Sequence, residues 1–371
     1  MNITCDNDRF YMQQAIELAK LGRFTTTPNP NVGCIIVKDN QIIGKGYHKK
    51  AGQPHAEVYA LQMAGDEAKD STAYVTLEPC SHFGRTPPCA DALIKAQLKR
   101  VVIAMQDPNP TVAGNGIKRL SDAGIEVTVG VLTEQAEELN KGFLKRMRTG
   151  MPYVQLKLAT SLDGKIAMAS GESKWITSSV ARQDVQKFRA QSCCILSTRA
   201  TVQSDNASLT VRDAELPDDI KQIYSSEKIR QPVRIIIDSQ NKLTGNENIF
   251  KQLGETWIVR KQDMPVTKPN TKLIIESSAN KNINLTKLFS LLANNNQINS
   301  IWVEAGAHLA GALIEQDLVD ELIIYYAPKL LGHNAKDMCI LPNLQNLSMA
   351  PKFRVKSATM VGEDLRVILK K

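Results

Sequence analysis

The feature that most restricts how this chain can fold is a set of three potential metal ligands that lie far apart in the sequence. His55 opens the tripeptide His55-Ala56-Glu57, and two thiols follow at Cys80 and Cys89. One imidazole and two thiolates leave the fourth position of a tetrahedral zinc ion open for water, as catalytic zinc requires. The segment before residue 150 must therefore be a scaffold that brings these side chains to one point.

The acid Glu57 is not needed as a ligand and is free to move protons. Zinc with three protein ligands makes hydroxide available near neutral pH, and Glu57 can take the proton of the water and return it to a departing amine. His-x-Glu followed by Pro-Cys and a later Cys is typical of zinc-dependent nucleobase deaminases. The general pattern spaces the cysteines as Cys-x-x-Cys, however, whereas eight residues separate Cys80 from Cys89 here. A structural zinc site with His82 as fourth ligand, or unrelated core cysteines, stay open as alternatives.

Apolar runs alternate with helical periods throughout the first half. This pattern predicts an α/β domain in which helices cover both faces of a mostly parallel sheet. Ligands of such sheets bind beyond the strand ends, where residues 78–89 and Asp107-Pro108-Asn109 fall. The polar loop around Pro28 and Pro30 can likewise present Asn29 to a ligand. We expect strands at 32–37, 42–47, 73–77, 101–105 and 125–129, the first two paired as a β-hairpin, and helices at 7–21, 55–63, 89–97, 117–123 and 134–141.

A basic stretch with glycine and proline, residues 145–152, interrupts this pattern. We place the domain boundary there, so that the domains cover residues 1–148 and 149–371. The second half again alternates and predicts an α/β domain, with a terminal antiparallel hairpin. We expect its strands at 153–159, 194–197, 233–237, 256–259, 272–275, 300–304, 321–326, 353–360 and 364–369, and its helices at 180–190, 285–293 and 307–316.

No Gly-x-Gly-x-x-Gly motif follows an early strand of the second half, so the usual dinucleotide fingerprint is absent. Small residues instead join a strand to a helix between Glu304 and Ala312. A helix start without bulky side chains is a natural phosphate seat, although small residues there also serve close packing. Both interpretations stay open on spacing alone.

Composition indicates an intracellular protein of two domains. The length of 371 residues suits two domains, and the start has neither a basic region followed by an apolar run nor a membrane-length apolar stretch. We therefore expect a cytoplasmic protein. The net charge of +8 comes without a dense Lys/Arg block, which argues against nucleic acid. Seven cysteines suit reduced thiols. Cys5, Cys34 and Cys339 carry no assigned role, and adjacent Cys193 and Cys194 are expected in the core.

Three segments of the first half closely resemble the deaminase domain of the bifunctional riboflavin-biosynthesis deaminase-reductases. They are Thr27-Pro28-Asn29-Pro30-x-Val32-Gly33, His48-x-x-Ala51-Gly52-x-x-His55-Ala56-Glu57, and Val75-Thr76-Leu77-Glu78-Pro79-Cys80-x-His82-x-Gly84-Arg85-Thr86-Pro87-Pro88-Cys89. The long cysteine spacing is that family's own variant. The resemblance implies a cytidine-deaminase-like α/β/α fold, zinc ligands at His55, Cys80 and Cys89, and a proton shuttle at Glu57. Substrate contacts would be Asn29, His48, Arg85, Asp107 and Asn109. Arg85 suits a phosphate by charge, or is an ordinary surface arginine.

The second half resembles the reductase domain of the same family, which has a dihydrofolate-reductase-like α/β fold and uses NADPH. The resemblance rests on segments such as Leu156-Lys157-x-Ala159-x-Ser161-Leu162-Asp163-Gly164-Lys165, Gly171-Glu172-Ser173-x-Trp175-Ile176-Thr177 and Leu209-Thr210-Val211-Arg212. Cofactor contacts would be Ala159, Trp175, Thr201, Asp205, Ser239 and the backbone of Gly306, Ala307, His308, Leu309, Ala310, Gly311 and Ala312. Substrate contacts would be Ser173, Arg189, Leu209, Arg212 and Glu304. Lys157 joins them as a further substrate contact, or is a solvated strand end. Arg189 and Arg212 suit a phosphate, or form ordinary ion pairs.

The resemblance therefore implies a two-step enzyme of riboflavin biosynthesis. Zinc hydroxide would deaminate 2,5-diamino-6-(5-phosphoribosylamino)pyrimidin-4(3H)-one, and NADPH would then reduce the ribosyl group of 5-amino-6-(5-phosphoribosylamino)uracil to ribityl. We expect a phosphorylated small-molecule substrate, no nucleic-acid or membrane partner, and a homo-oligomer. Two alternatives remain: a nucleoside or tRNA deaminase fused to an unrelated nucleotide-binding domain, and a structural-zinc interaction protein without chemistry.

Overall fold

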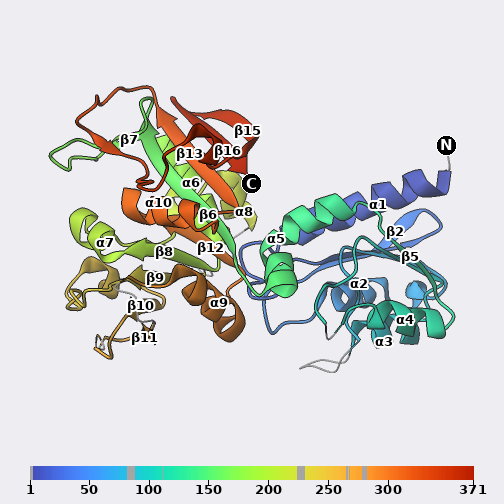
Figure 1. Cartoon of the computed structure of the whole chain (residues 1–371). Helices are drawn as coiled ribbons and strands as arrows, with labels where there is room; N and C mark the ends of the chain where they lie inside the picture. Colours follow the sequence, from blue (N-terminus) through green and yellow to red (C-terminus); the bar gives the residue numbers. More distant parts are fainter. Residues whose placement is uncertain are drawn as a thin grey trace. The chain divides into compact units, whose positions relative to one another are not determined.

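The computed structural model describes residues 3–81, 88–110, 112–223, 230–264, 266, 268–277 and 282–371. The chain divides into two compact units, Met1–Gly150 and Met151–Lys371 (Figure 1). This division falls after Gly150, close to the boundary at 148 that the basic stretch suggested.

The first unit contains a five-stranded sheet with the strand order β2-β1-β3-β4-β5. Its strands are β1 (Gly33–Lys38), β2 (Gln41–Tyr47), β3 (Thr72–Val75), β4 (Arg100–Ile103) and β5 (Glu126–Val129). β3, β4 and β5 run parallel, but β1 is antiparallel to both of its neighbours. The antiparallel β1–β2 pair confirms the predicted hairpin, whose tight turn at Asp39 and Asn40 has φ angles of 49° and 62° that suit a two-residue connection. The antiparallel pairing of β1 with β3 was not predicted.

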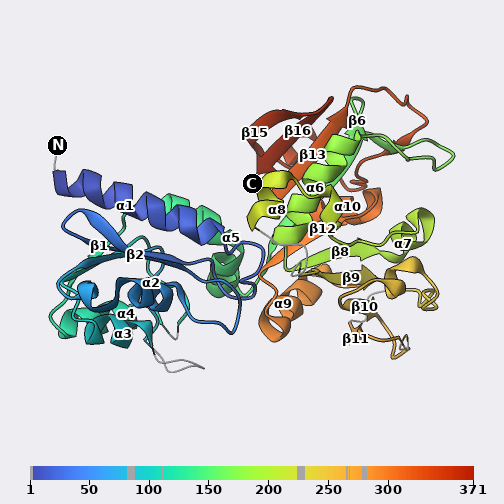
Figure 2. The same ribbon diagram turned by 180° about the vertical axis from the view of Figure 1, so that it is seen from behind.

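Helices cover both faces of this sheet (Figures 1 and 2). They are α1 (Ile3–Lys20), α2 (Ala56–Ala64), α3 (Cys89–Lys95), α4 (Asn115–Asp122) and α5 (Thr133–Thr149). Successive residues of β1 face opposite sides: Ile35 joins the core beneath α1 and α5, whereas Ile36 joins the core beneath α2, α3 and α4. This arrangement is the predicted α/β/α fold.

Helix α5 corrects the expectation of an irregular break at the basic stretch. It continues to Thr149 and ends at Gly150, whose φ of 68° is left-handed. Phe143 and Leu144 are buried, whereas Arg148 is exposed. The stretch is therefore polar in sequence but helical in structure, with Arg148 exposed and Lys145 and Arg146 half-buried.

The second unit contains a nine-stranded sheet with the order β11-β10-β9-β8-β12-β6-β13-β16-β15. Strands β11 through β13 in this order are parallel, and the predicted hairpin of β15 and β16 adds two antiparallel strands at one edge. The strands are β6 (Tyr153–Ser161), β8 (Cys194–Thr198), β9 (Val233–Ile237), β10 (Thr256–Arg260), β11 (Thr271–Ile275), β12 (Ser300–Glu304), β13 (Glu321–Ala327), β15 (Arg354–Val361) and β16 (Asp364–Lys370).

Helices again lie on both faces of this second sheet. They are α6 (Ser179–Gln191), α7 (Arg199–Asp205), α8 (Asp218–Ile223), α9 (Leu285–Asn296) and α10 (Ala307–Glu315), and a small separate sheet pairs β7 (Lys165–Ala167) with β14 (Lys336–Asp337). The sequence did not predict α7, α8, β7 or β14. Each of them is too short for a hydrophobic period to repeat often enough to be recognised. Trp302 is fully buried on one face and stacks on Phe188 with ring centroids 5.0 Å apart. Cys193 and Cys194 are buried, as predicted.

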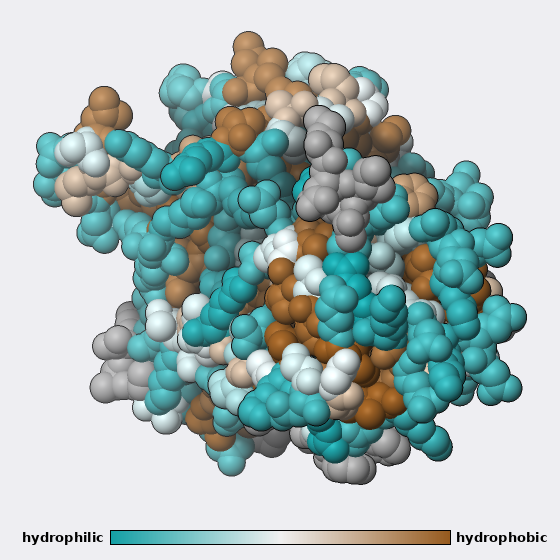
Figure 3. Space-filling model, turned by 90° about the vertical axis from the view of Figure 1, so that its right-hand side faces the viewer, coloured by the Kyte–Doolittle hydropathy of each residue, from teal (hydrophilic) through white to brown (hydrophobic). Residues whose placement is uncertain are grey.

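Across the described ranges, none of the helices combines the length and apolar character that a bilayer crossing needs. On the face drawn in Figure 3, hydrophilic residues predominate, and hydrophobic residues show between them near the middle.

Gly33 marks the point where α1 packs directly onto β1. A Cβ at this position would lie 2.0 Å from the carbonyl oxygen of Ala15 and 2.9 Å from the nitrogen of Ala19. Both are backbone atoms of a packed helix, so Gly33→Ala must push α1 away from the sheet. We expect the free energy of unfolding of the first unit to fall by about 1–3 kcal/mol, measured by urea denaturation. An unchanged transition midpoint would contradict this account of the α1 contact.

Candidate zinc and cofactor sites

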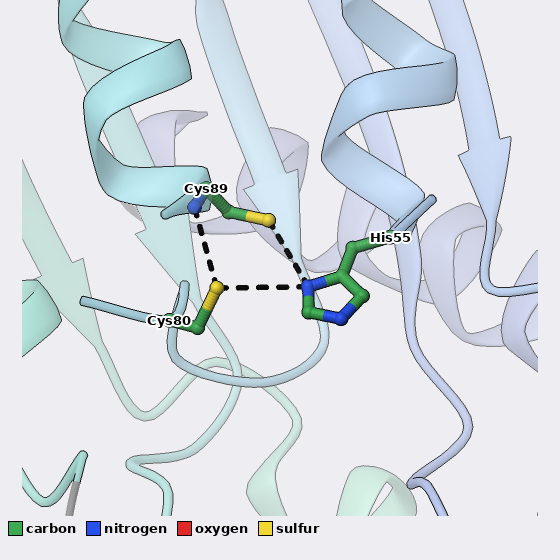
Figure 4. A group of neighbouring side chains, drawn as sticks. All are labelled: His55, Cys80 and Cys89. Carbon is green, nitrogen blue, oxygen red and sulfur yellow. Dashed lines mark hydrogen bonds between the residues drawn. The ribbon is translucent and has the colours of Figure 1, made fainter. Parts of the chain in front are cut away.

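His55, Cys80 and Cys89 point toward one another in the first unit (Figure 4). His55 is the residue before α2, Cys80 lies on the loop after β3, and Cys89 begins α3. The Nδ1 atom of His55 lies 3.2 Å from Cys89 Sγ and 3.6 Å from Cys80 Sγ. All three ligand atoms lie within 4.8 Å of one another. The structure thus brings together the three side chains that the sequence singled out.

The three donors fit a tetrahedral zinc ion. Typical bonds to zinc of about 2.0 Å for nitrogen and 2.3 Å for sulfur separate two such ligand atoms by about 3.6 Å. The His55–Cys80 and His55–Cys89 separations of 3.6 and 3.2 Å lie at or just below that value. Hydrogen bonding from Cys89 lowers the pKa of Cys80 to about 4 against the effect of burial, and His55 contributes to the lowering. Cys80 is therefore readily present as the thiolate that a metal binds.

Glu57 lies beside this cluster in the first turn of α2 and is buried. Its Oε2 atom is buried and has no hydrogen-bond partner among the residues that the structure describes. Burial raises the pKa of Glu57, although His55 opposes the shift. A carboxyl group whose pKa is raised in this way can both accept and donate a proton.

His48, which is buried, and Asn29, which is half-buried, form a pair next to the metal ligands. His48 Nδ1 lies 3.1 Å from the carbonyl oxygen of Pro54, and its Nε2 lies 3.1 Å from Asn29 Nδ2. Since the Pro54 carbonyl can only accept, we assign the ring proton to Nδ1, and Nε2 then accepts from Asn29. Burial lowers the pKa of His48, which keeps the ring neutral. The rings of His48 and His55 meet edge to face, 5.4 Å apart.

Asp107 and Asn109 lie on the loop after β4, at the same end of the parallel strands as Cys80. Asp107 is buried, and its Oδ1 accepts from the backbone nitrogen of Asn109 at 2.8 Å. The adjacent Glu78 carboxylate accepts from the backbone nitrogen of Asp107 at 3.1 Å. We assigned no role to Glu78 from the sequence, because its partners lie about thirty residues downstream. His82 and Arg85 lie outside the described residues.

A second charged cluster in the second unit joins the end of β12 to the middle of β6, so Lys157 is not at a strand end. Lys157 and Glu304 are direct neighbours in the register of these parallel strands. Arg189 donates to both Glu304 oxygens, from Nε at 2.6 Å and from Nη2 at 2.8 Å. Trp302 Nε1 also donates to Glu304 at 2.8 Å. Burial lowers the pKa of Lys157, and Glu304 opposes this shift.

The structure places the other predicted substrate residues of this unit near the same helices. Arg189 donates to the carbonyl oxygen of Thr210, so its helix is tied to the segment that carries Leu209 and Arg212. Leu209 is buried, whereas Arg212 forms an exposed ion pair with Glu215. Ser173 is half-buried. Both arginines therefore have carboxylate partners, and only Arg189 has a buried one.

The start of α10 fits a phosphate-bearing cofactor. Gly306 precedes the helix without a side-chain cap, and a Cβ added there would meet no atom within 4 Å. The first backbone N–H groups of α10 thus have open space before them, which suits phosphate. Gly311 differs, because a Cβ there would lie 1.8 Å from the carbonyl oxygen of Ile340. Of the predicted run, Leu309, Ala310 and Gly311 are buried, whereas Gly306 and His308 are exposed.

The remaining predicted cofactor residues surround the ends of neighbouring strands. Trp175 is 62% exposed, and the Arg182 guanidinium lies 4.2 Å from its ring centroid. The list is completed by Ala159 on β6, Thr201 and Asp205 on α7, and Ser239 just after β9, all of them half-buried. Ala159 lies on β6, α7 follows β8, and Ser239 follows β9, and these three strands belong to one sheet.

Asp163 is a second residue to which we assigned no role from the sequence. Its carboxylate accepts from the backbone nitrogens of Leu331 and Gly332, and from Ser161 Oγ. The Ser161 hydrogen bond and these backbone donors lower the pKa of Asp163 to about 2. The residue therefore ties the loop after β6 to the loop after β13. No local signal could have found this contact, because the partners lie far apart in sequence.

Known proteins resemble the chain over both units. Residues 5–105 match the family described as "Cytidine and deoxycytidylate deaminase zinc-binding region", and residues 152–367 match the "RibD C-terminal domain". The riboflavin biosynthesis protein RibD of Escherichia coli is 57% identical over 359 residues, which cover 96% of this chain and 98% of that protein.

Two solved structures match the whole chain. One form of Acinetobacter baumannii RibD is 46% identical with a TM-score of 0.92, and 99% of each chain is covered. The diaminohydroxyphosphoribosylaminopyrimidine deaminase/5-amino-6-(5-phosphoribosylamino)uracil reductase of Thermotoga maritima is 32% identical with a TM-score of 0.87, again over 99% of each chain.

The Arg189–Glu304 pair predicts how the second unit responds to acid. Burial alone would raise the pKa of Glu304, but the Arg189 guanidinium lowers it from its usual 4.5 to about 2. Its contribution to stability is therefore complete above the unfolded pKa near 4.5 and is lost as the pH falls toward 2. We expect Glu304→Gln to destabilise this unit by about 3 kcal/mol at pH 7, since Arg189 loses its buried counter-charge. Urea midpoints of the two proteins should converge as the pH falls through this window, and a constant difference would contradict the prediction.

Proposed function

Since this chain belongs to the RibD family of riboflavin biosynthesis proteins, we propose that His55, Cys80 and Cys89 hold its zinc ion and that Glu57 moves protons beside it. Support comes from the donor set, whose three atoms lie within 4.8 Å of one another. The observation that carries the proposal is the buried Glu57 oxygen without a partner among the described residues.

The chain is a bifunctional enzyme of riboflavin biosynthesis, a deaminase and a reductase in one polypeptide. It deaminates 2,5-diamino-6-(5-phosphoribosylamino)pyrimidin-4(3H)-one and then reduces the ribosyl group of 5-amino-6-(5-phosphoribosylamino)uracil to ribityl. Its cofactors are zinc and NADPH. A nucleoside or tRNA deaminase fused to an unrelated domain is not favoured, because both units match the same family.

In the deaminase, one side chain near the zinc ligands transfers protons and the others bind the substrate. Bound to these ligands, zinc supplies Lewis acidity that makes water nucleophilic near neutral pH. Glu57 accepts a proton on its free Oε2 and returns it to the departing amine. Asn29, His48, Asp107 and Asn109 hold the pyrimidine, with His48 fixed as the neutral tautomer by Pro54. Arg85 would meet the phosphate.

In the reductase, we assign the charged cluster to the substrate and the strand-end loops to the cofactor. NADPH supplies the hydride, and its phosphates suit the open start of α10 at Gly306. The backbone from Gly306 to Ala312, with Ala159, Trp175, Thr201, Asp205 and Ser239, would hold it. Ser173, Leu209 and Arg212 would complete the substrate pocket.

Arg189, Glu304 and Lys157 would meet the substrate as a unit. Arg189 uses three of its five N–H groups within the protein, on Glu304 and Thr210, so two remain for a phosphate or hydroxyl. The lowered pKa of Lys157 reflects its burial beside this pair. A lysine held in this way is a well-placed hydrogen-bond donor to the ribose.

Composition, the state of the cysteines and an exposed edge strand bear on the partners and the compartment of the enzyme. We infer that the chain binds no nucleic acid, since aromatic residues make up 5% of it and its positive charge is dispersed. The six cysteines with described side chains form no disulfide, which suits the cytoplasm. We infer a homo-oligomer from β15, an edge strand on which Val355 is 67% and Met360 61% exposed.

Glu57→Gln tests the deaminase. The substitution keeps the shape of the side chain but removes the proton acceptor, so ammonia release should fall by about 10²–10⁴-fold. Zinc content and NADPH oxidation with the reductase substrate should stay unchanged. Glu67→Gln, at an exposed acid of the same unit, serves as the control. Ammonia release at the wild-type rate would exclude Glu57 as the proton shuttle.

The double substitution Val355→Lys with Met360→Lys tests the oligomer. Two charges on the edge strand should block its pairing with a second copy and lower the mass measured by light scattering to that of one chain. Leu253→Lys, at a residue that is 85% exposed outside this strand, should leave the mass unchanged. A double variant with the mass of the wild-type oligomer would place the interface elsewhere.

A further inference from the structure

Glu78 has an unusual set of partners for a buried acid. It lies just beyond β3, two residues before Cys80, and is 3% exposed. Its Oε2 accepts from the backbone nitrogens of Asp107 at 3.1 Å and Gly114 at 3.0 Å. Its Oε1 accepts from those of Gly116 at 2.9 Å and Ile117 at 3.3 Å. One carboxylate therefore binds four backbone N–H groups of a single downstream segment.

Three of these four groups belong to the start of α4. The first N–H groups of a helix have no acceptor inside the helix and need one from elsewhere. Gly114, the residue before α4, has no side chain that could cap them, and it adopts a left-handed φ of 87°. Glu78 supplies the missing acceptor from another element, and its negative charge suits the positive end of the helix.

The fourth group fixes the other end of the same loop. The backbone nitrogen of Asp107 shares Oε2 of Glu78 with Gly114, so a single oxygen atom joins the first and last parts of the loop. Asp107 in turn accepts from the backbone nitrogen of Asn109 at 2.8 Å. The positions of Asp107 and Asn109 therefore depend on the carboxylate of Glu78.

The start of α4 is in close contact with the backbone beside Glu78. A Cβ added to Gly116 would lie 2.0 Å from the carbonyl oxygen of Pro79. Pro79 is the residue between Glu78 and the zinc ligand Cys80. The start of α4 thus packs directly on the backbone that carries the metal ligand.

We propose that Glu78 is a positioning residue that locks the Asp107–Asn109 loop to the Cys80 loop, so that substrate contacts and metal ligands share one rigid frame. This inference rests on the proposed function, in which Asp107 and Asn109 bind the pyrimidine. Glu78 itself binds neither zinc nor substrate, because both of its oxygens are occupied by backbone donors.

Glu78→Gln in the full-length chain is the test. Glutamine keeps the shape but replaces one acceptor oxygen with an NH₂ group, which then faces backbone N–H donors. We expect KM for the diaminopyrimidine phosphate to rise at least tenfold, with one zinc ion still bound per chain. Hydrogen exchange should accelerate in peptides that contain Gly114 and Gly116. Glu78→Asp, which keeps the charge on a shorter chain, should recover part of the lost affinity.

Two controls separate a local effect from general damage. NADPH oxidation by the same polypeptide reports the other unit and should match wild type. Glu17→Gln, at an exposed acid on α1, should leave KM, zinc content and exchange unchanged. If Glu78→Gln fails to fold, Gly116→Ala tests the same frame while keeping the Glu78 side chain. Its Cβ would lie 2.0 Å from the carbonyl oxygen of Pro79 and 3.2 Å from Oε1 of Glu78, so it would push the start of α4 away from both, and the same rise in KM is expected.

The outcomes distinguish this inference from the proposed function. Wild-type KM in both Asp107→Asn and Asn109→Ala would overturn the assigned substrate contacts. A raised KM in those variants, with wild-type KM and exchange in Glu78→Gln and Gly116→Ala, would overturn the positioning role alone. Loss of zinc from Glu78→Gln without a change in KM would assign Glu78 to the support of the metal ligands and would also overturn the proposal.

Discussion

The parallel pairing of β3 with β4 is the constraint on which the deaminase site depends. Val75 and Ile103, the last residues of the two strands, are partners in the register. The ladder continues beyond them, because Ala104 donates to Val75 at 3.0 Å and Glu78 donates to Met105 at 3.0 Å. The two loops therefore leave the sheet side by side at one edge. Cys80 on one loop and Asp107 and Asn109 on the other, for which we propose roles in metal and substrate binding, therefore lie at the same end of the sheet.

In the reductase unit, too, the register of two parallel strands brings the side chains of the candidate site together, and these side chains are charged. The parallel register of β6 and β12 sets Lys157 beside Glu304, and Arg189 reaches them from α6. Two cations and one anion in a buried setting leave a net positive charge. That net charge suits a phosphorylated substrate. From the sequence alone, Arg189 was equally consistent with an ordinary ion pair.

Periodicity in the sequence predicted most long elements of both sheets and the convergence of His55, Cys80 and Cys89. It could not predict that β1 is antiparallel to β3, because alternation of strands and helices does not show on which side of a hairpin the next strand pairs. It also could not pair Arg189 with Glu304, which are 115 residues apart, since charge alone does not select a partner. The contacts of Glu78 could not be predicted from the sequence for a further reason. Their donors are backbone N–H groups, which leave no signature in residue types.

Glu57 and Glu78 show how environment divides the work between two identical side chains. Both are buried to the same degree, at 3% exposure, in the same unit. Four backbone donors satisfy Glu78, so both of its carboxylate oxygens are held in place. Glu57 has a buried oxygen without a partner among the described residues, and burial raises its pKa. The unsatisfied carboxylate can exchange protons, whereas the satisfied one can only support. This difference supports the proposal that proton transfer in this site falls to Glu57.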